Sequence, residues 1–575
     1  MSYNSSNTHN ILVQCPKTSA VVFTTTWYVP INSPAFTVCS KCWEDKIRTT
    51  QFAGQFQAER FSADPRRFCL WNSEKMNRLG AATLNDRAWE LIRQYMIDRG
   101  KIQNCTGPTI GLTASTATGG YSWYSLRNKE ISGFVCCEAC YSDTVRATAF
   151  ADKFVLENGG VNGQSVTCDM AISFIKKSLL DNSITQNWPL FIQSAAARMR
   201  IPACNSLKGA PCSSTLWYMP NPPMNRILIC GACFHDGADL TPMAPSFSQV
   251  QVPENRKGEI WDCANSNTVL GMVVAWNEAC DKKNVALWHN AASIIQNLPP
   301  CTKDGITNGV WYTLSGCPDF KICGRCFVGI IQPFGLGRYF QHTGGPADGS
   351  AYICDLFPGF PRAQSYFLKI DEAVGVNDFS IFHNFVARLA PLPPCPKDGP
   401  WTNRLWYCGE EATICESCYE EAIRNTSLAG TLTLQKRTEE FICDAYSPRM
   451  RRLWDEACAK NNIQSFNVAL RERRQVYQAT MPRMRMILEM AKMRMNTQAT
   501  LFMSSTLLQG ADNIVSASQS HRTHDYGNSQ IGYHWATAAG AQGAMQFQQA
   551  LNMNIAPTGD MAEMSQLGAC WRQYE

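Results

Sequence analysis

Two kinds of apolar and polar pattern alternate along this 575-residue chain. One is rich in Thr, Ser, Pro, Val and Trp, as in 15–28, and predicts short strands and turns. The other has the apolar spacing of helices, as in 74–100, where two helices are predicted. Related helical patterns follow at 276–292, 370–389 and 453–470. This recurring order of strands and then helices predicts an α+β fold built from repeated small units.

A cysteine pattern marks five such units. Each has a lone cysteine, a Trp-Tyr pair, a Cys-x-x-Cys and one further cysteine, and the period is 90, 99, 97 and 94 residues. A period of this length suits one small domain per unit and exceeds that of a solenoid repeat. We predict a β-rich four-cysteine platform with a helical hairpin in each unit. The predicted bounds of the five units are 1–101, 102–200, 201–297, 298–391 and 392–480.

Four cysteines per unit suit one tetrahedral zinc ion. Such a site is structural, because no ligand position remains open for a substrate. In the third unit Cys212 could replace Cys204, but the Ile-Pro-Ala-Cys ending at Cys204 matches the Leu-Pro-Pro-Cys sequences ending at Cys301 and Cys395. The predicted ligands are Cys15, Cys39, Cys42 and Cys69; Cys105, Cys137, Cys140 and Cys168; Cys204, Cys230, Cys233 and Cys263; Cys301, Cys323, Cys326 and Cys354; Cys395, Cys415, Cys418 and Cys443.

Two disulfides per unit are the main alternative to zinc, followed by redox-active thiols and iron–sulfur ligation. The N-terminal sequence MSYNSSNTHN lacks a basic region followed by an apolar stretch, so no secretory signal is visible. Cytosolic and nuclear compartments keep thiols reduced. We therefore expect an intracellular protein, cytoplasmic or nuclear, with about five structural zinc ions.

Comparison among the units gives structural roles to residues that could otherwise suggest catalysis. Cys280 and Cys458 align with a valine in the fourth unit, which is typical of a small buried apolar position. His289 and His383 align with Asn467, so we expect a fixed hydrogen bond there and no shared metal role. The Trp-Tyr pairs are expected in cores, although paired aromatics can also stack on bases. Aspartates that follow the last cysteine are expected to cap helices: Asp169, Asp355 and Asp444.

The C-terminal region has a different character. Between 449 and 494 there are 11 Lys or Arg and four Asp or Glu residues, a local charge of +7 against +5 for the whole chain. We predict a basic, Met-rich helix over 481–504 that packs on the last unit, binds another subunit, or contacts nucleic acid or an acidic membrane. From 505 to 575 there is no Lys, and we predict a low-complexity tail that is disordered or self-associating. Nucleic acid would bind through Arg471, Arg473, Arg474, Arg483 and Arg485.

Several motifs are absent from the sequence. No uncharged apolar run of about 18 residues predicts a membrane span, and no phosphate loop, nucleophile elbow or metalloprotease helix motif occurs. Because these catalytic motifs are absent and the four-cysteine sets are closed, we predict that the protein is not an enzyme.

The charge content argues against an array of nucleic-acid-binding fingers. Only 17% of residues are charged, with nearly balanced signs, whereas an array of five such fingers should be far more basic.

The segment WYVPINSPAFTVCSKCW of the first unit has a wider resemblance. It resembles a motif of Trp-aromatic, Pro and Phe-Thr-Val-Cys-x-x-Cys-aromatic in large cysteine-rich repeat proteins of filamentous fungi. The match weakens in the fourth unit, which lacks the Pro-rich spacer, and in the fifth, which is shorter before Cys415. The resemblance covers the repeats and not the tail. It implies a fungal source and intracellular zinc units, and it implies no activity.

The leading hypothesis is a non-enzymatic, multivalent scaffold that binds protein partners or assembles as a homo-oligomer through its C-terminal helix and tail. Connections between units are short, which predicts a semi-rigid rod or arc. The alternative is a nucleic-acid-binding protein that uses the basic helix. A third class is an enzyme with ubiquitin-transfer or thiol-redox chemistry, but redox chemistry conflicts with metal ligation.

Overall fold

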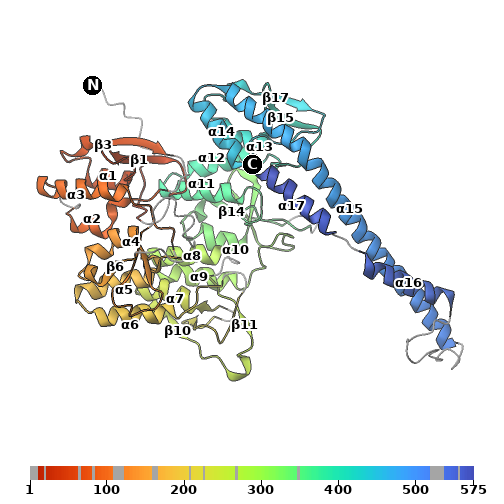
Figure 1. Cartoon of the computed structure of the whole chain (residues 1–575), viewed down its shortest axis with the longest axis horizontal. Helices are drawn as coiled ribbons and strands as arrows, with labels where there is room; N and C mark the ends of the chain where they lie inside the picture. The colour runs from red at the N-terminus through yellow and green to blue at the C-terminus, as the bar shows by residue number, and fades with distance from the viewer. Residues whose placement is uncertain are drawn as a thin grey trace. The chain divides into compact units, whose positions relative to one another are not determined.

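The computed structural model describes residues 11–17, 21–61, 67–80, 84–107, 122–157, 166–205, 209–224, 227–265, 270–345, 350–518, 537–553 and 557–575. These residues form a mixed α+β structure with small three-stranded sheets (Figure 1). The chain divides into two compact bodies, an N-terminal body (Met1–Pro391) and a C-terminal body (Leu392–Glu575). The division coincides with the predicted boundary between the fourth and fifth zinc units, whereas the first four predicted units share one body.

Each cysteine group lies beside a three-stranded antiparallel sheet with one recurring strand order. The central strand carries the Trp-Tyr pair: β1 (Thr25–Pro30), β4 (Trp123–Leu126), β8 (Trp217–Pro220), β12 (Trp311–Leu314) and β15 (Arg404–Cys408). One neighbour leads into the Cys-x-x-Cys: β2 (Val38–Cys39), β5 (Val135–Cys137), β9 (Ile229–Cys230), β13 (Cys317–Cys323) and β16 (Thr413–Cys415). The other neighbour follows later: β3 (Phe56–Phe61), β6 (Phe154–Leu156), β10 (Phe247–Gln249), β14 (Phe340–Thr343) and β17 (Thr433–Arg437). We call the part of the chain that corresponds to each predicted unit a segment. The third segment adds a two-stranded sheet of β7 (Ala210–Pro211) and β11 (Ile260–Trp261).

A short helix begins inside each Cys-x-x-Cys: α1 (Ser40–Lys46), α4 (Glu138–Asp143), α7 (Gly231–Asp236), α10 (Gly324–Cys326) and α13 (Glu416–Cys418). In the last two a π-helical turn continues it, at Phe327–Ile331 and Tyr419–Ile423. A pair of helices follows the last cysteine: α2 (Glu74–Arg78) and α3 (Asp86–Gly100); α5 (Ser173–Ile184) and α6 (Trp188–Met199); α8 (Leu270–Asp281) and α9 (Val285–Ile295); α11 (Ala363–Gly375) and α12 (Ser380–Leu389); α14 (Pro448–Ala459) and α15 (Ile463–Ser518). Between the paired helices the chain turns through a residue with positive φ: Gln186, Lys283, Asn377 and Asn461 in the last four pairs.

The tryptophans of the Trp-Tyr pairs lie in the hydrophobic cores, as predicted, except for Trp123, which is half-buried. The other four are at most 1% exposed: Trp27, Trp217, Trp311 and Trp406. The third and fourth segments share one continuous core, whereas the first, second and fifth have cores of their own. The backbones of the third and fourth segments also pack directly, since a Cβ at Gly329 would lie 2.5 Å from the Cα of Gly271.

A buried arginine joins the first predicted unit to the second, and another joins the second to the third. Arg99 at the end of α3 forms a two-pronged ion pair with Asp143 in α4, with N···O distances of 2.7 and 3.0 Å. Arg198 in α6 pairs with Asp236 in α7 in the same way. Both arginines precede the next lone cysteine by six residues. The same position holds Ile295 before the fourth unit, where the contact is apolar.

The fourth segment returns to the first within the N-terminal body. The Val13 amide donates to the Gly375 carbonyl at the end of α11, with an N···O distance of 2.8 Å. Leu12 and Phe23 are buried in a core that includes Val376. The first four segments therefore do not follow one another in a straight line, which corrects the expectation of a rod for this part of the chain. The contact depends on tertiary packing between residues more than 350 positions apart.

Removing a junction arginine is expected to destabilise the N-terminal body. Arg198 is 6% exposed, so Arg198→Ala leaves the Asp236 carboxylate without its charge partner in a partly buried place. We expect a loss of about 3 kcal/mol in the free energy of unfolding, measured by urea denaturation of the metal-loaded protein. The control is Arg200→Ala at an exposed residue two positions on, which should change the free energy by less than about 0.5 kcal/mol. Equal effects of the two changes would contradict a joining role for Arg198.

The C-terminal region is more ordered than its composition predicts. The basic helix is not confined to 481–504, because α15 extends over Ile463–Ser518 and begins within the predicted fifth unit. The predicted disordered tail contains α16 (Ala538–Asn552) and α17 (Thr558–Arg572), so this expectation is corrected for those residues. Their packing against α15 supplies the burial that the tail cannot achieve alone. Residues 519–536 lie outside the described residues.

Candidate metal centres

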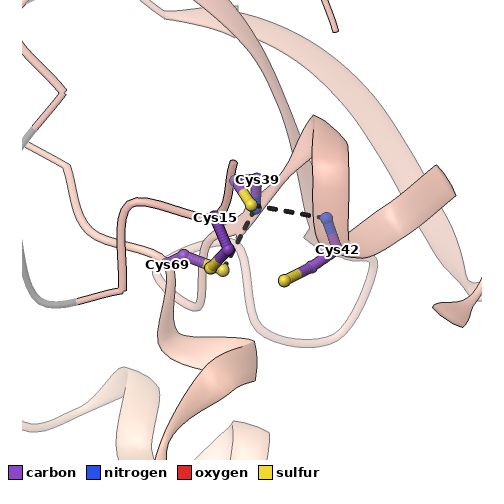
Figure 2. A group of neighbouring side chains, drawn as sticks. All are labelled: Cys15, Cys39, Cys42 and Cys69. Carbon is purple, nitrogen blue, oxygen red and sulfur yellow. Dashed lines mark hydrogen bonds between the residues drawn. The ribbon is translucent and has the colours of Figure 1, made fainter. Parts of the chain in front are cut away.

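The structure brings the cysteines together in five groups of four. In each group the Sγ atoms all lie within 4.8 Å of one another. The five groups consist of the twenty cysteines proposed from the sequence, and Figure 2 shows the first, with Cys15, Cys39, Cys42 and Cys69 around one point. In the third group the member is Cys204. Cys212 lies apart from it and donates its thiol to the Arg256 carbonyl.

The spacing of the sulfur atoms fits a metal ion and not a disulfide. A tetrahedral zinc site with Zn–S bonds of about 2.3 Å has sulfur atoms about 3.8 Å apart. The Sγ atoms of Cys301 and Cys326 are 3.9 Å apart, whereas a disulfide requires about 2.05 Å. All 27 cysteines carry free thiols. Each group can therefore hold one metal ion, and with four protein ligands a tetrahedral ion would have no open position for a substrate.

The sheet fixes the position of each Cys-x-x-Cys. The tryptophan of the Trp-Tyr pair is the cross-strand partner of the first cysteine of the motif in all five sheets, from Trp27 opposite Cys39 to Trp406 opposite Cys415. That cysteine is also the N-cap of the short helix, with φ between −68° and −75° in every case. The helix therefore begins at the residue after the first cysteine, two residues before the second. Its first turn aims both thiols toward the group.

Backbone amides point at the sulfur atoms. The N–H of the first cysteine of the Cys-x-x-Cys donates to the last cysteine's Sγ in four groups, with N···S distances of 3.3 to 3.5 Å. Among the described residues, the N–H two residues after the lone cysteine donates to that cysteine at Lys17, Gly107 and Lys397. Such bonds favour the thiolate form that a metal requires.

The thiols also need a cation to ionise together. Burial raises the pKa of Cys354 and of Cys443 well above the usual range of a thiol, and neighbouring cysteines contribute to both shifts. A bound divalent cation reverses this preference, because its charge compensates several thiolates at once. In the fifth group Arg451 lies 3.8 Å from the Cys418 sulfur and adds a fixed positive charge.

The aspartates that follow the last cysteine do not act as helix caps. Their carboxylates accept the backbone N–H of the residue two positions before the Cys-x-x-Cys, at 2.7 or 2.8 Å: Asp169 from Val135, Asp355 from Lys321 and Asp444 from Thr413. Burial raises the pKa of Asp169 and of Asp355 to about 6. The bond ties the segment carrying the last ligand to the strand carrying the middle two. The helix-cap prediction is therefore wrong, and α14 is capped instead by Ser447.

An aromatic stack lies beside every group and was not predicted from the sequence. The tyrosine of each Trp-Tyr pair stacks on the aromatic residue that follows the Cys-x-x-Cys, with ring centroids 3.4 to 4.0 Å apart and planes within 8°. The signal was present, since an aromatic residue occupies that position in all five copies: Trp43, Tyr141, Phe234, Phe327 and Tyr419. The stacks account for the tyrosines as packing residues.

The aligned histidines and the remaining cysteines lie outside the groups. His383 contacts the Ser315 carbonyl and Asn467 contacts Glu410, so two of the three aligned residues make the expected hydrogen bond. The Nε2 atom of His289 is buried and makes none. Cys280 and Cys458 are half-buried rather than buried. Cys136, Cys317 and Cys408 are buried members of strands and belong to no group.

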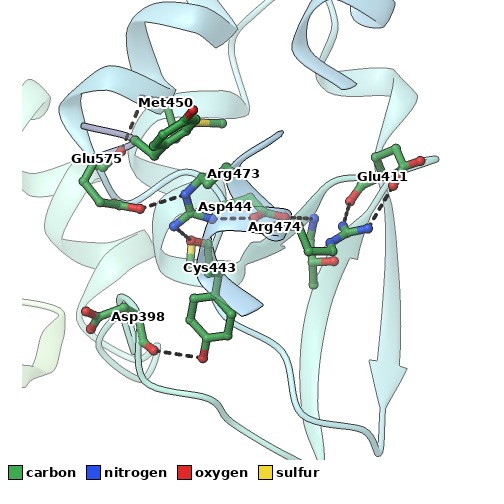
Figure 3. Close-up of polar contacts among 12 residues, drawn as sticks. Asp398, Glu411, Cys443, Asp444, Met450, Arg473, Arg474 and Glu575 are labelled. Atoms are coloured by element: carbon green, nitrogen blue, oxygen red, sulfur yellow. Dashed lines mark hydrogen bonds and ion pairs between the residues drawn. The ribbon is translucent and has the colours of Figure 1, made fainter. Parts of the chain in front are cut away.

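The arginines proposed for nucleic-acid binding have partners inside the C-terminal body. Arg473 is 1% exposed and lies between Asp444 and Glu575, with N···O distances of 2.8 Å to each (Figure 3). Arg471 and Arg474 pair with Glu411 on the β15–β16 connection. Arg483 pairs with Glu563 of α17, and Arg485 donates to the Asp398 carbonyl and the Tyr477 hydroxyl. These contacts fit a helix that packs on its own unit, the first of the three roles considered for it.

No protein-family model, curated protein or solved structure matches this chain. The resemblance to fungal cysteine-rich repeat proteins therefore stays a prediction. Within the described part of the chain, no helix has both the length and the apolar character needed to cross a bilayer.

Proposed function

We propose that the protein is a non-enzymatic structural protein built from five tandem units, each stabilised by one zinc ion. Each set of four cysteines would hold its ion through four thiolates. The ion would supply cross-linking of three chain segments and no substrate chemistry. The protein would assemble with copies of itself or with protein partners inside the cell.

The observation that carries the proposal is the fivefold recurrence of one local geometry. The strand order, the Trp–Cys register, the N-cap cysteine and the stacked tyrosine are the same at all five groups. Independent catalytic sites would be expected to differ in their open ligand positions and in their neighbouring acids or bases. Five closed sites of one design suit a role in holding the chain together.

Two other functions receive less support. Nucleic-acid binding through Arg471, Arg473 and Arg474 would require these side chains to leave carboxylates that they already contact. Thiol-redox chemistry would require free thiolates in the Cys-x-x-Cys motifs, which compete with metal ligation.

Counting the metal tests the proposal directly. Native mass spectrometry with elemental analysis of the purified protein should find five zinc ions per chain, because each group offers one four-sulfur site. Chelation should unfold the protein, since structural zinc contributes on the order of 10 kcal/mol per site to folding. A chain without metal, with its mass lowered by paired cysteines, would contradict the zinc units. Metal-free thiols in a folded chain would contradict them as well.

A further inference from the structure

One side of α15 is already used within the chain. α16 lies alongside the C-terminal half of α15 (Figure 1), and three residues spaced by seven face it. Gln498 donates to the Ala550 carbonyl, Ser505 is buried against Gly543, and Asp512 accepts from Thr537. Because seven residues are almost two helical turns, this spacing defines one straight face of α15.

The opposite side of α15 carries a second row with the same period. Its residues are Met493, Asn496, Thr500, Met503, Leu507, Gly510 and Ile514, which we call the α15 seam. The apolar members are among the most exposed hydrophobic residues of the described chain: Met493 is 62% exposed, Met503 68%, Leu507 69% and Ile514 73%. The spacing of three and four residues is the pattern with which a helix packs against another helix in a coiled coil.

From Asn496 to Gly510 the α15 seam has no charge on it or beside it. Residues 495–511 contain no Asp, Glu, Lys or Arg, and the positions flanking the seam are small: Thr497, Ala499, Ser504, Thr506, Ala511 and Asn513. A charged partner helix would lose hydration there without gaining an ion pair. A partner with an equally uncharged seam has no charged groups to dehydrate, and the small flanking residues allow the two helices to approach closely.

We propose that the α15 seam binds the α15 seam of a second copy of the chain. This inference rests on the self-assembly part of the proposed function and names the surface that carries it. A two-fold contact joins the same patch on both subunits, so a seam that is free of charge is automatically compatible with its copy. From Met493 to Ile514 the row covers about three heptads, a length from which a heptad pattern indicates a coiled coil.

The fifth unit favours an antiparallel orientation, because it packs on the beginning of α15 through Phe466 and Leu470. A parallel pair would bring the two fifth units to the same end of the contact, whereas an antiparallel pair separates them. With a two-fold axis between Met503 and Ser504, Thr500 of each copy faces Leu507 of the other.

The test measures the mass of the full-length, metal-loaded protein by analytical ultracentrifugation over a concentration series. Wild type should be a dimer or a multiple of dimers. Leu507→Glu should weaken dimer formation by about a hundredfold or more, because it places an unpaired charge in an apolar contact. The matched control is Leu488→Glu, at a 50% exposed leucine of the same helix that lies off the seam, and it should associate like wild type.

A second variant tests the orientation and guards against a change in folding. Thr500→Lys combined with Leu507→Glu should restore association to within about tenfold of wild type, because each lysine faces a glutamate of the other copy only in the antiparallel pair. Thr500→Lys alone should weaken association. Circular dichroism and metal content should match wild type in every variant, since both positions are exposed.

The outcomes separate this inference from the proposed function. An oligomer that survives Leu507→Glu overturns the seam and leaves self-assembly standing through another surface. A monomeric wild type overturns both the seam and self-assembly, and the zinc count then decides whether the structural units stand. Loss of association without rescue by the double variant overturns the antiparallel pairing.

Discussion

Replacing Cys354 with alanine should remove one zinc ion from the chain and unfold the core shared by the third and fourth segments. Cys354 is 1% exposed, and its sulfur accepts the Cys323 N–H at 3.3 Å. Three remaining thiols cannot close a tetrahedral site, so most of the metal's contribution, on the order of 10 kcal/mol, is lost. That is comparable with the entire stability of an ordinary domain, about 5 to 15 kcal/mol. The shared core spreads the effect from the fourth group to the third.

Elemental analysis and thermal unfolding of the variant measure this effect. The control is Cys317→Ala, since Cys317 is a buried cysteine of β13 that belongs to no group. It should retain all five ions and lose only about 1 kcal/mol for the smaller side chain. If both variants kept five ions and lost the same amount of stability, Cys354 and the other cysteines of its group would contribute packing and would not bind a metal ion.

Replacing Arg473 with alanine should have the largest effect among the arginines of α15. Arg473 is 1% exposed and bonds to Asp444, Glu575 and the Cys443 carbonyl, while its guanidinium faces the rings of Tyr446 and Trp571. Its removal leaves two carboxylates in a buried place, and burial already raises the pKa of Asp444. We expect a loss of about 3 to 5 kcal/mol in the free energy of unfolding of the C-terminal body.

The matched control for Arg473 lies two residues earlier on the same helix. The Arg471 side chain is 49% exposed and pairs with Glu411 at 3.4 Å, so Arg471→Ala should cost less than about 1 kcal/mol. Urea denaturation of both variants with zinc present gives the comparison. Similar small losses for both would mean that the buried cluster does not hold α15 to its unit. Arg473→Lys should lose nearly as much stability as Arg473→Ala, because a lysine has no planar guanidinium to contact both carboxylates.

The candidate metal groups could be predicted from sequence because each depends on short-range spacing. Two ligands sit in one turn of chain, and the other two keep a nearly constant distance from it in five copies. Internal comparison also favoured Cys204 over Cys212, and Cys204 is the member of the third group. The same comparison could have found the stacked aromatic after each Cys-x-x-Cys.

Longer-range contacts could not be predicted in this way. The roles of Asp169, Asp355 and Asp444 were misassigned because a local helix cap and a bond to a strand about 30 residues away have the same sequence signal. The sequence of α15 indicated a basic patch because the partners of its arginines, such as Glu411 and Glu563, are about 60 to 80 residues away. Composition also gave disorder for a tail that gains burial only against α15.

The sequence by itself determined the fivefold cysteine plan, the α+β character and the order of strands and helices. These follow from spacing, residue type and local backbone preference, which act over a few tens of residues. Only the tertiary structure decided that the fourth segment returns to the first, that the third and fourth share one core, and that the basic helix is neutralised from within. Such contacts depend on which distant surfaces meet in the folded chain, and no local pattern encodes that.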